Sequence, residues 1–282
     1  MNRSSTYQRV RTPLSLLATA SVATALIATA VAPAHADRTT SAPDSEKKPT
    51  VVLVHGAFAD STSWNGVIRR LRHEGYPVVA AANPLRGLNN DASYLKEVLA
   101  GIEGPVVLAG HSYGGSVISN AAHDADNVKA LVFVAAFLPE KGESAVELSG
   151  KFPGSTLGDA LHSVPVTLPD GSRDADLTIE PSKFHQQFAA DVPRNTTDLM
   201  SVTQRPITNA ALADDASESG WKNIPSWAVV ATQDRNIPAQ AQIFMAERAH
   251  AHITRVRASH AVSVSHPADV AGVIEAAART VR

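Results

Sequence analysis

The chain has 282 residues, of which 44% are hydrophobic and 18% are charged, a balance that allows one α/β domain or two smaller ones. The formal net charge is −2 and no basic block occurs, so neither nucleic acid nor an anionic membrane surface is expected as a partner. The chain has no cysteine, which excludes disulfides, thiolate metal sites and a cysteine nucleophile.

The N-terminal segment, residues 1–36, has the pattern of a secretory signal peptide. Arginines near its start give a positive charge, residues 14–31 are apolar and alanine-rich, and an Ala-His-Ala cleavage motif ends at Ala36. A membrane anchor is the alternative, because the apolar run is nearly long enough to span a bilayer. We expect cleavage near Ala36, secretion to the extracellular space or periplasm without stable membrane association, and a disordered polar leader over residues 37–49.

From Thr50 onward, short apolar runs alternate with helical patterns, which predicts an α/β fold with a mostly parallel central sheet and helices on both faces. The expected strands, in chain order, are Thr50–Val54, Pro77–Ala82, Pro105–Ala109, Ala130–Ala135, Ser226–Ala231 and His252–Arg257. The expected helices are Ser63–Glu74, Asp91–Ile102, Ser112–His123, Ala239–His250 and Pro267–Val281. Start signals support three of these helices: Asn90-Asp91, Pro238 and Pro267.

The alternation of strands and helices stops between Pro139 and Ile224. This stretch is rich in proline, has a turn signal at Pro169-Asp170-Gly171, and is too long for a connecting loop in a compact domain. We predict that residues 140–224 form a cap, inserted between the two parts of the α/β core, 50–139 and 225–282. A partly disordered insertion is the alternative.

A serine lies inside a glycine-rich pentapeptide between a predicted strand and a predicted helix. The residues are Gly110-His111-Ser112-Tyr113-Gly114. In a sharp strand-to-helix turn the serine has strained backbone geometry, and the flanking glycines remove side chains that would collide there. Its Oγ then projects from the top of the sheet, which predicts that Ser112 is a nucleophile. The alternative is an ordinary turn whose serine caps the helix.

Two loops that follow later strands supply partners for this serine. A serine hydroxyl needs an adjacent base held by a third group, and in sheet-based hydrolases these follow in the order serine, acid, histidine. We predict that His260 is the base and that Asp234 orients it. Glu140 is the alternative acid, His266 is the alternative histidine, and Asp234 could instead be a turn or cap residue.

The negative oxygen of an acyl-transfer intermediate needs hydrogen-bond donors. We predict that two backbone N–H groups donate to this oxygen: that of Ala57, in the turn after the first strand, and that of Tyr113, at the helix start. Phe58 is the alternative to Ala57. Phe58 and Phe137 are expected to line an apolar acyl pocket. Further aromatic candidates for this pocket are Tyr113, Phe152, Phe184 and Phe188.

The remaining histidines give no pattern of metal ligands. His250 and His252 lie at irregular spacing from His260 and His266, and no H-E-x-x-H motif occurs. His55 and His111 are interpreted as structural residues that hydrogen-bond the turns they occupy. Neither a Walker loop nor a G-x-G-x-x-G turn is present, so neither a metal nor a cofactor is expected.

These motifs resemble the α/β-hydrolase superfamily, specifically the small cofactor-free serine esterase branch that includes plant methylesterases and hydroxynitrile lyases. The resemblance implies a sheet of the eight-stranded type, trimmed at its N-terminal edge. Ala261 stands where the lyases have a lysine that handles cyanide, and Ser112 where haloalkane dehalogenases have an aspartate, so ester hydrolysis is the implied activity. The matching stretches are Val51–Phe58, Gly110–Gly115, Val132–Pro139, Thr232–Pro238 and Ser259–Pro267.

The sequence therefore predicts a secreted serine hydrolase that cleaves small carboxylic esters through an acyl-enzyme. The same triad could serve a cofactor-free haloperoxidase or an acyltransferase, in which peroxide or an alcohol replaces water. The fold could also act as a non-catalytic binding protein. The acyl and alcohol specificity and the oligomeric state stay open at this stage.

Overall fold

The computed structural model describes residues 47–168 and 171–281. The predicted signal peptide, most of the predicted leader, and Pro169 and Asp170 of the predicted turn lie outside these residues. None of the helices within the described ranges is long and apolar enough to cross a membrane.

Six parallel strands form the central sheet, and all six coincide with strands predicted from the sequence. Their order across the sheet is β2-β1-β3-β4-β8-β9, so the chain moves outward from β1 to β2 and then returns to the other side of β1. This reversal makes the carboxyl ends of β1 and β3 the switch point at which open α/β sheets bind ligands. The strands are β1 (Thr50–Val54), β2 (Val78–Ala81), β3 (Val106–His111), β4 (Val128–Val134), β8 (Ser226–Ala231) and β9 (His252–Val256).

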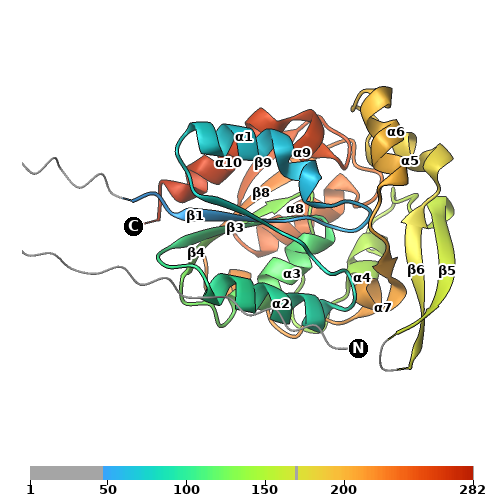
Figure 1. Ribbon diagram of the computed structural model, residues 1–282, viewed down its shortest axis with the longest axis horizontal. Helices are drawn as coiled ribbons and strands as arrows, with labels where there is room; N and C mark the ends of the chain where they lie inside the picture. Colours follow the sequence, from blue (N-terminus) through green and yellow to red (C-terminus); the bar gives the residue numbers. More distant parts are fainter. Residues whose placement is uncertain (1–46, 169–170, 282) are drawn as a thin grey trace, which may run out of the picture. The chain divides into compact units, whose positions relative to one another are not determined.

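Helices cover both faces of this sheet (Figure 1). On one face α1 packs against α10, and on the other α2 packs against α3. The mostly parallel α/β architecture predicted from the sequence is confirmed. The helices of the core are α1 (Asn65–His73), α2 (Leu88–Ala100), α3 (Tyr113–Ala122), α8 (Ala239–Arg248), α9 (Val262–Ser265) and α10 (Pro267–Ala278), and a 3₁₀ turn, η1 (Ser61–Trp64), precedes α1.

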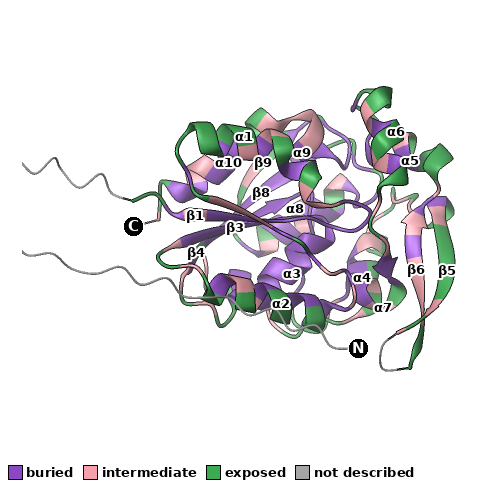
Figure 2. Cartoon of the chain, viewed as in Figure 1, coloured by how far each residue is buried: buried purple, intermediate pink, exposed green. Residues whose placement is uncertain are grey.

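The central strands are buried on both faces, which Figure 2 shows as continuous purple ribbons. Within β1, Val51 and Leu53 belong to the apolar cluster on the α1 and α10 side. Val52 and Val54 belong to the cluster on the α2 and α3 side. Because neighbouring side chains of a strand point to opposite faces, a covered parallel strand must be apolar at every position.

One predicted helix start is wrong. The sequence suggested that Asn90-Asp91 precedes a helix, but α2 begins at Leu88. The Asp91 carboxylate does not cap this helix: it accepts hydrogen bonds from the Arg86 backbone N–H at 3.1 and 3.2 Å and from the Tyr113 hydroxyl at 2.8 Å. The Asp91 carboxylate therefore holds the loop just before α2 and the Tyr113 hydroxyl rather than the helix start.

The stretch between β4 and β8 contains a second, antiparallel sheet and four helices. The sheet has the order β5-β6-β7, and the long hairpin β5–β6 was not predicted from the sequence. Its elements are α4 (Ala145–Gly150), η2 (Gly158–Ala160), β5 (Leu161–Thr167), β6 (Arg173–Ile179), α5 (Pro181–Phe188), α6 (Arg194–Val202), β7 (Ile207–Thr208), α7 (Asn209–Ala213) and η3 (Gly220–Lys222).

This inserted stretch packs directly on the strand-and-helix core. Phe184, Phe188 and Ile207 belong to the same buried cluster as Val54 and Phe58. Arg86, in the loop after β2, forms an ion pair with Asp176 of β6. The Ala261 backbone N–H, in the loop after β9, donates to the Phe188 carbonyl at 3.0 Å. The insertion is therefore joined to loops at the carboxyl edge of the sheet.

Candidate active site

Ser112 occupies the sharp turn that joins β3 to α3. Its backbone has φ 55° and ψ −126°, a region that non-glycine residues rarely adopt, and its side chain makes no capping hydrogen bond to α3. Such strain persists only where the surroundings enforce it. The glycines on either side permit the turn: a Cβ on Gly110 would lie 2.5 Å from the Gly114 carbonyl oxygen, and one on Gly114 would lie 2.6 Å from the Val54 carbonyl oxygen.

The three residues predicted to form a triad lie in contact. His260 Nε2 is 2.8 Å from Ser112 Oγ, and His260 Nδ1 is 2.7 Å from Asp234 Oδ2. Since an ionised carboxylate can only accept, Nδ1 carries the proton and Nε2 presents a lone pair to the serine hydroxyl. His260 is 1% exposed and Ser112 is 7% exposed, so this hydrogen-bonded chain is shielded from bulk water.

Asp234 also organises its own loop. Its Oδ1 accepts hydrogen bonds from the backbone N–H groups of Asn236 at 2.7 Å and Ile237 at 3.0 Å. Gln242 of α8 donates from Nε2 to Asp234 Oδ2 at 2.8 Å and to the Ile237 carbonyl at 2.8 Å. The residue is thus both a turn residue and the partner of His260, which were competing interpretations of the sequence. Three donors, the Asn236 and Ile237 N–H groups and Gln242 Nε2, therefore hold the Asp234 carboxylate in place beside the His260 ring.

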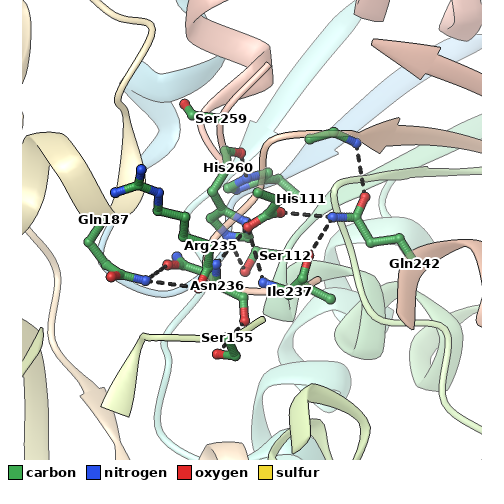
Figure 3. A network of polar contacts seen from close by, with 12 residues as sticks. His111, Ser112, Ser155, Gln187, Arg235, Asn236, Ile237, Gln242, Ser259 and His260 are labelled. Atoms are coloured by element: carbon green, nitrogen blue, oxygen red, sulfur yellow. Dashed lines mark hydrogen bonds and ion pairs between the residues drawn. The ribbon is translucent and has the colours of Figure 1, made fainter. Parts of the chain in front are cut away.

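The His260 ring lies between two other rings. The His111 ring centroid is 4.7 Å away, and the Phe188 ring meets His260 edge to face at 4.9 Å. His111 Nε2 donates to the His260 backbone carbonyl at 2.9 Å, because a carbonyl can only accept. His111 and Phe188 therefore fix the base from two sides (Figure 3 for His111).

Burial holds His111 in its neutral form. Burial, together with the smaller effect of the nearby charge of His260, lowers the pKa of His111 from 6.5 to about 3. Burial also lowers the pKa of His55, whose Nδ1 lies 2.9 Å from the Gly56 carbonyl in its own turn. The structural role expected for His55 agrees with this contact. His111 differs from the expectation, since it bonds the loop of His260 rather than its own turn.

The alternative acid and the alternative histidine lie in other contacts. Glu140 forms ion pairs with Lys222 at 2.9 Å and Arg248 at 3.7 Å. His266, the residue before α10, is 3.5 Å from a carboxylate oxygen of Asp191. Neither side chain hydrogen-bonds to Ser112 or His260 within the described part of the chain.

A cavity of about 230 Å³ opens beside Ser112. Ala57 and Tyr113, the predicted backbone donors, line it together with the predicted pocket residues Phe58 and Phe137. Tyr113 is the first residue of α3, where a backbone N–H has no intrahelical acceptor. The other lining residues are Ala145, Val146, Ser149, Ser155, Leu157, Gly158, Leu161, Leu212, Asn236 and Ile237.

Three of the aromatic residues suggested for this pocket lie elsewhere. Phe188 packs on His260, Phe184 stacks on Phe188 at 5.0 Å, and Phe152 contacts Phe244 at 5.6 Å. Phe184 and Phe188 are buried and Phe152 is half-buried, as their apolar character predicts, but these residues do not line the cavity. A single sequence does not show which surface of an insertion faces the core. Aliphatic residues of α4 and α7, with Leu157 just before η2 and Leu161 at the start of β5, line the cavity instead.

Two residues that support the site, Gln242 and Asn236, were not predicted from the sequence. Gln242 lies one turn into a predicted helix, and Asn236 lies in the loop that carries Asp234. A polar side chain among the alanine and methionine residues of one helix face was the available signal for Gln242, because buried amides need partners. Asn236 carried no such signal, since polar residues are ordinary in loops.

Within the described ranges, no group of three or more histidine, aspartate or glutamate side chains is arranged to hold a metal ion. The arrangement of Ser112, His260 and Asp234 supports nucleophilic attack by Ser112 on a carbonyl carbon. The required parts are an activated hydroxyl, an oriented base and an adjacent cavity.

The class of protein follows from both fold and comparison. Residues 51–273 match the alpha/beta hydrolase family, and the chain belongs to this family. The strand-turn-helix at Ser112 and the order serine, aspartate, histidine along the chain are the features that define its sites.

Several of the relatives and solved structures that resemble the chain are esterases by name. The carbendazim hydrolyzing esterase of Nocardioides sp. is 34% identical over 113 residues, which are 36% of this chain and 47% of that protein. The chain thus spans about half the length of this relative. Methylesterase 1 of Arabidopsis thaliana is 24% identical over 72% of this chain and 84% of its own. The crystal structure of polyneuridine aldehyde esterase superposes with a TM-score of 0.70 at 20% identity, over 81% of this chain and 98% of that one.

Proposed function

We propose that the protein hydrolyses small, uncharged carboxylic esters through an acyl-enzyme on Ser112. The observation that carries this proposal is the hydrogen-bonded chain from Asp234 Oδ2 through the His260 ring to Ser112 Oγ, with distances of 2.7 and 2.8 Å. The names of the relatives, among them a carbendazim hydrolyzing esterase and a methylesterase, support ester cleavage.

The residues take the following parts in the reaction. His260 Nε2 removes the proton of Ser112 Oγ as the oxygen attacks the ester carbonyl, and it returns a proton to the departing alkoxide. Asp234 keeps the imidazole in the productive tautomer and stabilises its transient positive charge. The backbone N–H groups of Ala57 and Tyr113 are proposed to bind the tetrahedral oxyanion. Water, activated by His260, then cleaves the acyl-serine.

The cavity limits the substrate. Its volume of about 230 Å³ suits a short acyl or alcohol group rather than a polymer. Among the described residues that line it, none has a charged side chain. Burying an unpaired charge there would cost several kcal/mol, so charged acyl groups should be rejected.

Hydrolysis of p-nitrophenyl butyrate by Ser112→Ala and Ser116→Ala variants tests this function. Ser116 lies on α3, is 1% exposed, and its Oγ has no hydrogen-bond partner among the described residues, so it is a matched serine outside the triad. Ser112→Ala should lose about 10⁴-fold or more in kcat with an unchanged melting temperature, and Ser116→Ala should keep its activity. Substantial activity in a folded Ser112→Ala variant would refute the proposal.

We also propose that the enzyme is exported and cleaved after Ala36. The support comes from the sequence pattern of residues 1–36 and from the absence of cysteine, which lets the chain fold without disulfides in an oxidising compartment. N-terminal sequencing of the protein recovered outside the cytoplasm should read from Asp37. A protein that keeps its first residues and stays in the cytoplasm would contradict export.

A further inference from the structure

The cavity beside Ser112 contains one side-chain amide in an otherwise apolar and hydroxyl lining. Asn236 lies in the loop after β8, is 3% exposed, and lines the cavity together with Ser112. Among the described lining residues it has the only side-chain nitrogen. Solvent still reaches its Nδ2 atom, so a ligand that enters the cavity would remove water from this donor and would have to replace the lost hydrogen bond.

A neighbouring glutamine fixes how the Asn236 amide is turned. Gln187 Nε2 donates to the Arg235 backbone carbonyl at 2.9 Å, and a carbonyl can only accept. The same nitrogen donates to Asn236 Oδ1 at 2.8 Å, while Gln187 Oε1 accepts from the Thr156 hydroxyl at 2.8 Å (Figure 3 for Gln187, Arg235 and Asn236). The Asn236 oxygen therefore faces Gln187, and its nitrogen faces away from it.

The Asn236 Nδ2 group is left with two free hydrogens. No hydrogen bond joins Nδ2 to any residue in the described ranges, whereas the Asn236 backbone is bonded on both sides. Its N–H donates to Asp234 Oδ1 at 2.7 Å, and its carbonyl accepts from the Ser155 hydroxyl at 2.9 Å. The loop is thus held rigidly while one donor stays available to a ligand, an arrangement typical of polar groups that set orientation in apolar pockets.

We propose that Asn236 Nδ2 donates a hydrogen bond to the substrate and makes the enzyme selective for uncharged esters that carry a second acceptor oxygen. Alkoxy esters and keto esters belong to this class. The inference rests on the proposed ester hydrolysis at Ser112. A simple alkyl ester would leave the amide desolvated and unpaired, so the site should discriminate against it.

Matched pairs of esters that differ by one CH₂-to-oxygen exchange test the proposal. One pair is p-nitrophenyl 3-methoxypropanoate and p-nitrophenyl pentanoate, and the other is 2-methoxyethyl butyrate and butyl butyrate. For each pair the ratio of kcat/KM is divided by the ratio of the rates of base hydrolysis, which removes intrinsic reactivity. The wild type should prefer the methoxy ester in at least one pair, by about fivefold for one neutral hydrogen bond.

Two variants remove the donor in different ways. Asn236→Leu keeps the approximate volume and removes both polar atoms, whereas Asn236→Asp keeps an oxygen toward Gln187 and replaces the NH₂ donor with the second, accepting oxygen of a carboxylate. Both should abolish the preference for the methoxy ester. If either variant disturbs the neighbouring Asp234, the rates for both esters of a pair change alike, so this effect cancels in the ratio of their kcat/KM values. Ser149→Ala, which removes a hydroxyl from the same lining, is the control and should keep the preference.

The results separate failure of this inference from failure of the proposed function. If the wild type hydrolyses none of these esters, the proposed function fails and the inference fails with it. If hydrolysis depends on Ser112 but the ratio is the same in wild type and both Asn236 variants, only the inference is overturned. Loss of the preference in Ser149→Ala alone would assign the donor to that serine and would also overturn it.

Discussion

Replacing His111 by leucine tests whether this buried imidazole is held neutral beside His260. Burial lowers the pKa of His111 to about 3 in the folded protein, whereas an unfolded chain has a histidine pKa near its ordinary value of 6.5. Between these two values the unfolded chain binds more protons than the folded one. The folded state therefore loses stability as the pH falls through this range, and the leucine variant should lack this contribution.

The size of the effect follows from the two pKa values. At pH 7.5 both states are almost fully neutral at this ring, so the contribution is close to zero. At pH 5 the unfolded ring is about 1.5 pH units below its pKa and the folded ring is still neutral, which costs the folded state about 2 kcal/mol. The variant also loses the hydrogen bond to the His260 carbonyl, about 1 kcal/mol at either pH.

Urea unfolding of the wild type and His111→Leu at pH 7.5 and pH 5 measures this difference. The wild type should have the larger free energy of unfolding at pH 7.5. Between pH 7.5 and pH 5 the difference in free energy of unfolding between the two proteins should shift by about 2 kcal/mol in favour of the variant. A control variant, His73→Gln, removes an exposed histidine of α1 and shows how much of the pH effect comes from losing any imidazole. A gap that stays constant with pH would refute the reasoning.

Three further substitutions probe the support of the triad. Asp234→Asn should keep the fold but present the wrong histidine tautomer, lowering kcat by about 10⁴-fold in an ester assay; a loss under tenfold would contradict it. Gln242→Leu leaves the Ala231 N–H without its 3.0 Å acceptor and removes a donor from Asp234, so urea unfolding should show a loss of about 3 kcal/mol, and an unchanged midpoint would count against it. Gly115→Ala forces a methyl group onto the Phe137 carbonyl oxygen and should lower the melting temperature and activity together, whereas a fully active, equally stable variant would show that the turn can relax.

The core of the fold was predictable because its signals are local. Each buried parallel strand is an apolar run such as Val51–Val54, and each helix that follows has its own periodicity, so all six strands of the sheet were found. The hairpin β5–β6 was not predicted, because most of β5 is exposed or half-buried and the strand contains Pro165. The start of α2 was misplaced because the Asp91 carboxylate, which looked like a helix cap, bonds the Arg86 N–H in the preceding loop and the hydroxyl of the more distant Tyr113.

The three triad residues could be proposed from the sequence because each follows a strand, and the carboxyl ends of parallel strands lie at one edge of a sheet. What surrounds them could not be predicted in this way. The roles of Phe188 and Gln187 depend on how the insertion packs, which sets the contact of Phe188 with the His260 ring and that of Gln187 with Asn236. Such long-range contacts leave no period or motif in a single sequence.

Labelling with a fluorophosphonate probe tests most directly whether Ser112 is an activated nucleophile. Intact mass measurement of the folded wild type should show one adduct, and peptide mapping should place it on Ser112. Ser112→Ala should take up no label, and His260→Ala should react far more slowly, because the base that accepts the serine proton at 2.8 Å is gone. A folded wild type that stays unlabelled, or that carries the label on a different serine, would contradict the assignment.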